Sequence, residues 1–226
     1  MNIKKIISEI FQDMISEFKE GFDMVHFASL KSFKARLEYA SRELSRIAEG
    51  SSRVAFSIDN TKVLKLAKNK KGLAQNETEG DEFLQSHYID IIPKLFEQEP
   101  NDLWIVMEKA DDVSKEQFKG LTGLDFYMEF YPYLAYAQRR NSPTNKAYMF
   151  KKEDDEKVRQ ILLKHPDLEN SGFVRDLVQM IVDNDMSWGD YYRLNSYGVV
   201  HRGGKEMVVV RDFGLTEDTM NSLYGR

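Results

Sequence analysis

Hydrophobic positions divide the chain into a helical beginning, a strand-rich middle and a mainly helical remainder. At the beginning, apolar residues recur at helical spacing from Ile3 to Phe18, and a second helix with one apolar side is predicted over residues 32–47. The charges between these apolar positions are mixed in sign, whereas a membrane-surface helix would prefer a basic polar face. We therefore expect residues 1–46 to form a helical extension that packs on the main fold or contacts a partner.

Short β-rich runs begin near residue 47. A first strand is predicted through Ile47 and Ala48, and residues 53–58 and 62–67 form a hairpin around Asp-Asn-Thr. A helix is predicted over residues 71–88, continuing through Gly80, and two further strands lie within 91–100 and 102–110. The order β-β-β-α-β-β predicts a small sheet-based lobe over residues 47–110.

The rest of the chain, residues 111–226, is predicted to be mostly helical. The helices are expected over residues 124–140, 154–165 and 172–185, and Pro132 kinks or restarts the first of them. A hairpin then joins residues 197–200 to 206–212, because a Gly-Gly pair between them suits a tight turn.

Composition excludes several classes of function. The net charge of −5 argues against a mainly nucleic-acid-binding surface. The absence of cysteine excludes disulfides, thiolate catalysis and Cys-zinc sites. Glu9 and Asp13 interrupt the apolar run at the N-terminus, and no uninterrupted run approaches the ~18 residues that span a bilayer. We expect a soluble, cytoplasmic protein that binds neither membrane nor nucleic acid.

Candidate chemistry in the strand-rich part begins with a turn of small residues, Gly50, Ser51 and Ser52, whose backbone N–H groups could approach a phosphate. Taken alone, the same residues also suit an ordinary hairpin turn. Lys65 lies inside an apolar strand, so it either points to a polar face or is paired with an acid. The acids that follow on the predicted helix are Glu77, Glu79 and Glu82.

A second group of polar residues lies downstream. Asp190 and Asn195 are five residues apart in a loop between a helix and the last hairpin, and Asp212 ends that hairpin. A carboxylate and an amide oxygen that converge with a second carboxylate suit Mg²⁺. A carboxylate left free beside them could orient or deprotonate an attacking hydroxyl.

The order of these features, ending in Asp212-Phe213-Gly214, resembles that of the protein-kinase-like superfamily. More loosely, the chain is similar to short kinase-like proteins encoded by bacteriophages. The resemblance covers about residues 47–216. It implies an α+β, bilobal fold with a five-stranded N-lobe over residues 47–110 and a reduced, mainly helical C-lobe over residues 111–226.

The resemblance also implies a nucleotide site for ATP and Mg²⁺. Lys65 matches the lysine that binds phosphates, with Glu79 as its partner and Glu82 in reserve. The remaining roles fall to Gly50, Ser51, Ser52 and Arg53 over the phosphates, Met107 as gatekeeper, the backbone of Glu108 and Ala110 at adenine, Asp190 as catalytic carboxylate, and Asn195 and Asp212 on magnesium.

Departures from the family pattern leave the activity open. The glycine loop keeps only Gly50, and Trp188 and Gly189 replace the His and Arg that precede the catalytic aspartate. Twelve residues follow Gly214, without Ala-Pro-Glu, so we expect no platform for peptide substrates. Three hypotheses follow. The first is a phosphotransferase that acts on an unidentified protein or small molecule, the second is a pseudokinase that binds nucleotide or serves as an adapter, and the third is an AMP transferase.

Overall fold

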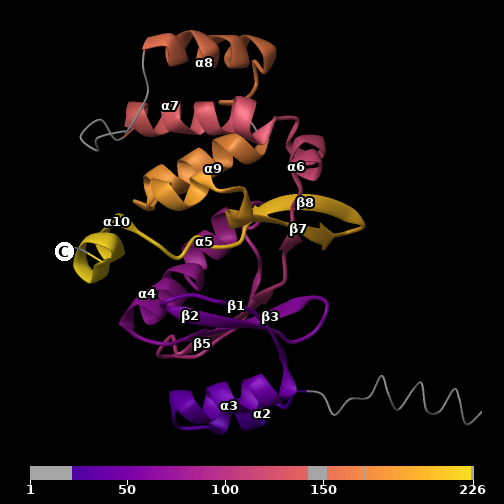
Figure 1. Cartoon of the computed structure of the whole chain (residues 1–226), viewed down its shortest axis with the longest axis vertical. Helices are drawn as coiled ribbons and strands as arrows, with labels where there is room; N and C mark the ends of the chain where they lie inside the picture. Colours follow the sequence, from indigo (N-terminus) through magenta and orange to yellow (C-terminus); the bar gives the residue numbers. More distant parts are fainter. Residues whose placement is uncertain (1–21, 142–151, 171, 225–226) are drawn as a thin grey trace, which may run out of the picture.

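The computed structural model describes residues 22–141, 152–170 and 172–224. Within these ranges the chain forms two lobes, one built on a five-stranded antiparallel sheet and the other mainly helical (Figure 1). This confirms the predicted α+β, bilobal arrangement with a five-stranded sheet in the first lobe. The periodic segment from Ile3 to Phe18 lies outside the described residues. None of the helices in the described ranges has both the length and the apolar character needed to cross a membrane.

The predicted strands of the first lobe are present. They are β1 (Ser45–Glu49), β2 (Arg53–Ser57), β3 (Lys62–Ala67), β4 (Leu95–Gln98) and β5 (Trp104–Glu108), in the spatial order β1-β2-β3-β5-β4. Side chains alternate across this sheet, so Val63 packs toward the helical lobe while Leu64 and Leu66 pack toward the opposite face. The sheet therefore has an apolar outer face and an inner face that borders the other lobe.

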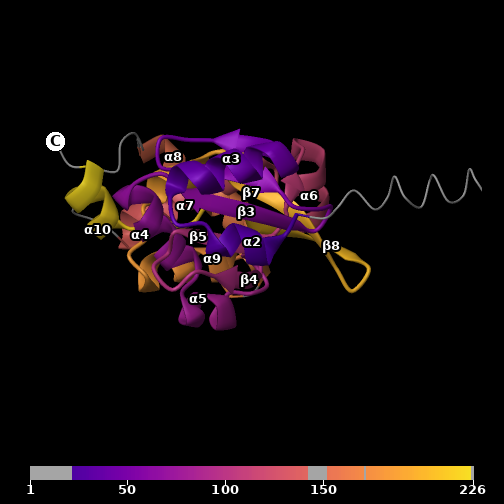
Figure 2. The same ribbon diagram turned by 90° about the horizontal axis from the view of Figure 1, so that it is seen from below.

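Two helices, α2 (Met24–Ser29) and α3 (Phe33–Glu43), cover the outer face of the sheet (Figure 2). Phe27 of α2 is fully buried and its ring lies 5.7 Å from that of Trp104. The prediction of a helix to residue 47 was too long. The helix ends at Glu43, because Leu44 turns extended and the residues from Ser45 pair with β2.

On the inner side, α4 (Lys70–Glu79) and α5 (Glu82–His87) follow β3. The prediction of a single helix through Gly80 was wrong, because α4 ends at Glu79 with Gly80 as its C-cap and α5 begins at Glu82. Asp81 is extended and its side chain accepts a hydrogen bond from the Leu84 N–H at 2.9 Å, which starts a new helix.

The helical lobe contains α6 (Lys115–Thr122), a π-turn η1 (Phe126–Phe130), α7 (Tyr131–Asn141), α8 (Lys152–Lys164), α9 (Gly172–Asp183), α10 (Glu217–Thr219) and a π-turn η4 (Met220–Tyr224). The helix expected over residues 124–140 starts as η1 and becomes an α-helix at Tyr131, next to Pro132, as the predicted restart requires. Helix α6 was not predicted; it begins with a capping box of Ser114 and Gln117.

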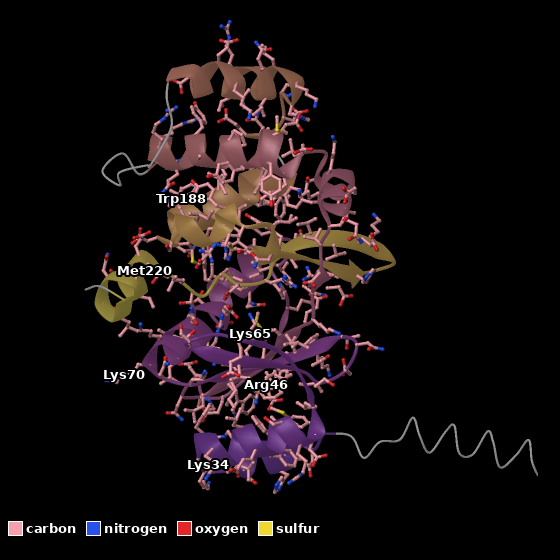
Figure 3. All side chains as sticks on the ribbon, viewed as in Figure 1. Lys34, Arg46, Lys65, Lys70, Trp188 and Met220 are labelled. Atoms are coloured by element: carbon pink, nitrogen blue, oxygen red, sulfur yellow. The ribbon has the colours of Figure 1, made fainter. Side chains whose placement is uncertain are left out.

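A small second sheet lies between the two lobes. It consists of β6 (Asp111–Asp112), β7 (Tyr197–Arg202) and β8 (Lys205–Val210). The predicted β7–β8 hairpin is confirmed, with Gly203 and Gly204 at φ of 58° and 77° in its turn. Two 3₁₀ turns, η2 (Trp188–Tyr192) and η3 (Leu194–Ser196), lead into β7. In Figure 3, Lys65 points from the large sheet toward this hairpin, while Trp188 lies in the helical lobe.

Candidate functional site

A cleft of about 660 Å³ lies between the inner face of the large sheet and the β6–β8 sheet, within the size range of small-molecule sites. The predicted site residues on its wall are Gly50, Ser52, Arg53, Lys65, Met107, Glu108, Ala110, Asn195 and Asp212. Glu79 lies buried behind the wall, and Ser51 and Asp190 lie beside the cleft. The fold therefore brings residues from both predicted groups to one place.

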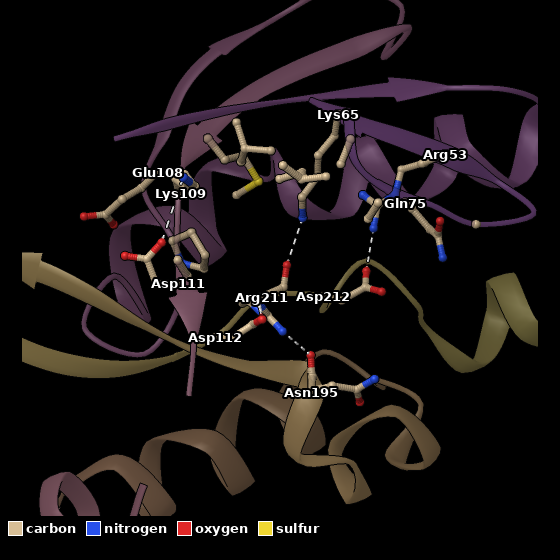
Figure 4. A pocket seen from close by; sticks show the side chains of 18 of the residues that line it. Arg53, Lys65, Gln75, Glu108, Lys109, Asp111, Asp112, Asn195, Arg211 and Asp212 are labelled. Atoms are coloured by element: carbon tan, nitrogen blue, oxygen red, sulfur yellow. Dashed lines mark hydrogen bonds and ion pairs between the residues drawn. The ribbon is translucent and has the colours of Figure 1, made fainter. Parts of the chain in front are cut away.

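Lys65 and Glu79 form a buried ion pair on the sheet side of this cleft. The Lys65 Nζ lies 2.5 Å from Glu79 Oε2. It donates a second hydrogen bond to the backbone oxygen of Arg211 at 2.9 Å, which Figure 4 shows. The Glu79 side chain is 0% exposed. Burial lowers the pKa of the Lys65 ammonium below its ordinary value, and the charge of Glu79 opposes that shift. The ammonium is thus held at a fixed point of the wall.

Glu79, and not Glu82, contacts Lys65 because the helix breaks between the two acids. Glu79 is the last residue of α4, and its side chain is buried between this helix and the sheet, where it contacts Lys65. Glu82 is the first residue of α5 and is exposed. The two acids were expected to be neighbours on one helix, and the break at Gly80 separates them.

Arg53 joins Glu79 to Asp212. One guanidinium nitrogen, Nη2, lies 2.8 Å from Glu79 Oε1 and 2.5 Å from Asp212 Oδ1, while Nη1 donates to Asn76 Oδ1 at 3.3 Å. Partial burial raises the pKa of the Asp212 carboxyl, but the charges of Arg53 and then Lys65 outweigh it and leave the pKa below its ordinary value. Asp212 is therefore ionised and already paired.

The turn of small residues between β1 and β2 is tied to the start of α4. The Ser52 hydroxyl donates to Gln75 Oε1 at 2.6 Å, and the Ser51 carbonyl accepts from Asn69 Nδ2 at 2.9 Å. The Gly50 N–H donates to the Arg53 carbonyl at 2.9 Å. The turn lies over the Lys65 end of the cleft in a defined conformation.

The opposite end of the cleft is formed by the last residues of β5 and the segment that follows it. The Met107 side chain is fully buried. The Glu108 N–H donates to the Lys94 carbonyl at 2.8 Å, and its carboxylate binds Arg202 of β7, whose Nε lies 3.1 and 3.0 Å from the two oxygens. The Glu108 side chain is thus bound to the other lobe, while Glu108 and Ala110 both line the cleft.

Asp190 and Asn195 occupy the 3₁₀ turns below the cleft. Asn195 is exposed on the cleft wall, and its carbonyl accepts from Arg211 Nη2 at 2.7 Å. Asp190 does not line the wall. Partial burial, and then the negative charge of Asp212, raise the pKa of the Asp190 carboxyl above its ordinary value. Asp190 is therefore close to Asp212 electrostatically without sharing a hydrogen bond with it.

The last strand delivers Asp212 to the cleft, and Phe213 and Gly214 follow it away from the cleft wall, with Gly214 in close contact with α4. Phe213 is buried in a core that residues of both lobes form. A Cβ on Gly214 would lie 2.5 Å from the Gln75 carbonyl, so only glycine permits this approach. The position of Asp212 is thus fixed by packing on both sides.

The sequence analysis did not identify three charged residues of the cleft, which are Arg211 and the two acids Asp111 and Asp112 at the start of the second lobe. Arg211 Nη1 donates to Asp112 Oδ1 at 2.6 Å, and Asp111 and Asp112 line the cleft beside it. A Cβ on Gly198 of β7 would lie 2.6 Å from the Arg211 side chain, so this glycine makes room for it. The available signal was a charged residue that ends the apolar run of β8, directly before Asp212.

No family model matches the chain, and no curated protein matches its sequence. Solved structures do show similarity. The gentamicin complex of APH(2")-IIa is 15% identical, with 82% of this chain and 70% of that chain covered and a TM-score of 0.33. The GDP complex of aminoglycoside 2'-phosphotransferase-IIIa is 13% identical, with 82% and 73% covered and a TM-score of 0.34. ADP-bound APH(2'')-Ib is 17% identical, with 80% and 70% covered and a TM-score of 0.33. At these values the similarity identifies neither an activity nor a substrate for this chain.

The donor groups of the cleft fit a divalent metal shared with phosphates. In the described part of the chain, no three acidic or imidazole side chains are grouped to hold a metal by themselves. Mg²⁺ bound together with phosphates needs only one or two protein carboxylates. Asp212 and Asn195 supply a carboxylate and an amide on the same wall, although one oxygen of Asp212 already contacts Arg53.

Proposed function

We propose that the chain is a kinase-like phosphotransferase that uses ATP and Mg²⁺ and acts on a protein or small-molecule acceptor. The observation that carries this proposal is the fixed Lys65–Glu79 pair on one wall of a cleft whose facing wall carries Asp212 and Asn195. Phosphoryl transfer needs positioning and charge neutralisation more than covalent chemistry from the protein. The cleft offers both.

The nucleotide is proposed to lie along the cleft with its base at the β5 end. Backbone groups of Glu108 and Ala110 meet the adenine beside the buried Met107. The phosphates then reach Lys65, whose ammonium is held by Glu79, beneath the turn of Gly50 to Ser52. This arrangement places the negative phosphates next to the cations of the wall.

The acidic and amide groups of the facing wall serve the transfer step. Asp212 and Asn195 are proposed to hold Mg²⁺, which when bound neutralises phosphate charge. Asp190, beside Asp212, is proposed to orient the acceptor hydroxyl and take its proton. Its raised pKa favours proton uptake, since a base works best with a pKa near the working pH.

Lys65→Met tests the nucleotide site. The fold is expected to survive, because Glu79 keeps its contact with Arg53 at 2.8 Å. Loss of one charge-assisted contact should weaken ATP binding by about tenfold or more, as measured by calorimetry in Mg²⁺. The matched control is Lys62→Met on the same strand, whose ammonium lies 5.3 Å from the Phe96 ring and outside the cleft. Equal ATP affinity for the two folded variants would remove Lys65 from the site, and no ATP binding by the parent protein would overturn the proposed function.

A second candidate, nucleotide binding without transfer, is favoured by two observations. Asp190 lies beside the cleft and does not form its wall, and Asp212 is already paired with Arg53. The two candidates separate when the parent protein and Asp190→Asn are incubated with ATP, Mg²⁺ and a cell extract. Mass spectrometry of the extract then shows phosphate adducts that need Asp190 for a transferase, and none for a binding protein. AMP adducts would instead indicate an AMP transferase.

A further inference from the structure

The Arg53 guanidinium neutralises two carboxylates that come from different lobes. It lies 2.8 Å from Glu79 at the end of α4. It also lies 2.5 Å from Asp212 after β8, a contact that Figure 4 shows. The Arg53 side chain is only 10% exposed. The Glu79 side chain is 0% exposed, whereas the Asp212 side chain is 60% exposed, so the Arg53–Asp212 contact is a charge-assisted hydrogen bond that an incoming ligand can reach.

The position of Arg53 follows from the register of the sheet. Ala55 is the partner of Lys65 in the β2–β3 ladder, and Arg53 lies two residues before Ala55 on the same strand. Arg53 therefore shares the inner face with Lys65, whereas Val54 faces α2 and α3. The two cations stand side by side on one wall of the cleft.

The four groups form an alternating series of charge: Lys65, Glu79, Arg53 and Asp212. Each carboxylate in this series has a cation before any nucleotide enters. If Arg53 were absent, Lys65 would be the one cation left in this series against two carboxylates, so the series would present a net negative charge to an incoming phosphate. A metal ion at Asp212 would then supply the missing positive charge, beside the Arg211 guanidinium that also lines the cleft.

We propose that Arg53 takes the place of a metal ion as counter-charge for Asp212, so that the cleft binds nucleotide phosphates without requiring Mg²⁺. This rests on the proposed nucleotide-binding function and concerns binding, not transfer. A guanidinium carries its charge at every physiological pH and its planar fork can bridge two oxyanions, which an ammonium cannot do equally well. Arg53 and a divalent cation thus compete for the same Asp212 oxygen.

The test is calorimetric titration of ADP in excess EDTA and, separately, in Mg²⁺. The parent protein should bind ADP with affinities that differ by less than about threefold between the two conditions. Arg53→Gln should lose about tenfold or more of its affinity in EDTA, the size expected for one lost charge-assisted contact, and recover it in Mg²⁺. The matched control is Arg46→Gln, on the same sheet, because Arg46 contacts Ser41 and Glu49 away from the cleft. It should behave like the parent protein.

Arg53→Lys serves if Arg53→Gln does not fold, because it keeps the charge but cannot bridge both carboxylates equally well. The ADP affinity of Arg53→Lys is expected to fall by about threefold or more in EDTA and to stay unchanged in Mg²⁺. Parental binding that is tenfold or more weaker in EDTA than in Mg²⁺ overturns this inference, as does an equal loss in both conditions for the Arg53 variants. Absence of ADP binding by the parent protein in either condition overturns the proposed function together with it.

Discussion

A lysine inside an apolar strand needs a counter-charge, and Lys65 has one in Glu79. The apolar run and the acids on the next helix indicated that Lys65 could be paired, and the kinase-like resemblance, not the local pattern, selected Glu79 as the partner. The contact of Arg53 with Asp212 could not be predicted, since it joins residues 159 positions apart through the arrangement of two lobes. Local pattern identifies a charge that needs a partner, and only the tertiary fold decides which partner it meets.

Glu79→Gln is expected to destabilise the fold strongly. The side chain is 0% exposed and contacts both Lys65 and Arg53, so its neutralisation leaves two shielded cations facing each other. Breaking a buried pair in this way costs about 3–5 kcal/mol of unfolding free energy. Urea unfolding measures it, with Glu77→Gln as the control on the exposed side of the same helix, for which about 0.5 kcal/mol or less is expected. Similar values for the two variants would show that Glu79 is not a structural counter-ion.

At the scale of elements, the turn between β1 and β2 and the helix α4 act as one unit. Side chains of Asn69 and Gln75 bind the turn, and Gly72 lets the two backbones approach. The existence of both elements followed from periodicity and small residues. Their docking did not, because it depends on which face of α4 meets the turn, and the break at Gly80 was hidden by acids that continued the helical pattern.

Gly72→Ala should disturb this docking. A Cβ at this position would lie 2.3 Å from the Ser52 carbonyl, a backbone atom that cannot easily move aside. We expect a loss of about 1–3 kcal/mol from overpacking, despite the better helix propensity of alanine. Gly120→Ala in α6 is the matched control, because no atom lies within 4 Å of its new Cβ, and there alanine should stabilise by about 0.5–1 kcal/mol. Guanidinium unfolding of both variants gives the comparison, and a stabilising effect at both sites would contradict the tight docking.

At the scale of the whole molecule, the large sheet is covered differently on its two faces. Helices α2 and α3 seal the outer face, and the inner face borders the cleft (Figures 1 and 2). The two-lobed fold was predictable from the order of strands and helices. The short helix α2 and the strand β6 were not, because six and two residues carry too little periodicity to stand out from a loop.

Phe27→Ala should lower stability without changing nucleotide binding. The ring is fully buried against Trp104 on the outer face, and removing such a side chain costs about 3–5 kcal/mol. Thermal unfolding and ADP titration of the same sample separate the two effects. Val25→Ala on the same helix is the control, since Val25 is 83% exposed and should matter by no more than about 0.5 kcal/mol. A changed ADP affinity in folded Phe27→Ala would contradict the division between a structural and a functional face.

The buried pair between Glu108 and Arg202 has a consequence for how the cleft can open. Arg202 also donates to the carbonyl of Ile92 at 2.8 Å, so one guanidinium fastens the segment between the lobes to the β7–β8 hairpin at several points. A large rotation of the lobes about this segment would separate the Arg202 guanidinium from its acceptors. The guanidinium would then be a buried charge without a partner, which is energetically costly. Ligand entry and exit are therefore expected to be slow and to depend on small local motions of the cleft away from this segment. Arg202 is then expected to affect the residence time of a ligand more than its affinity.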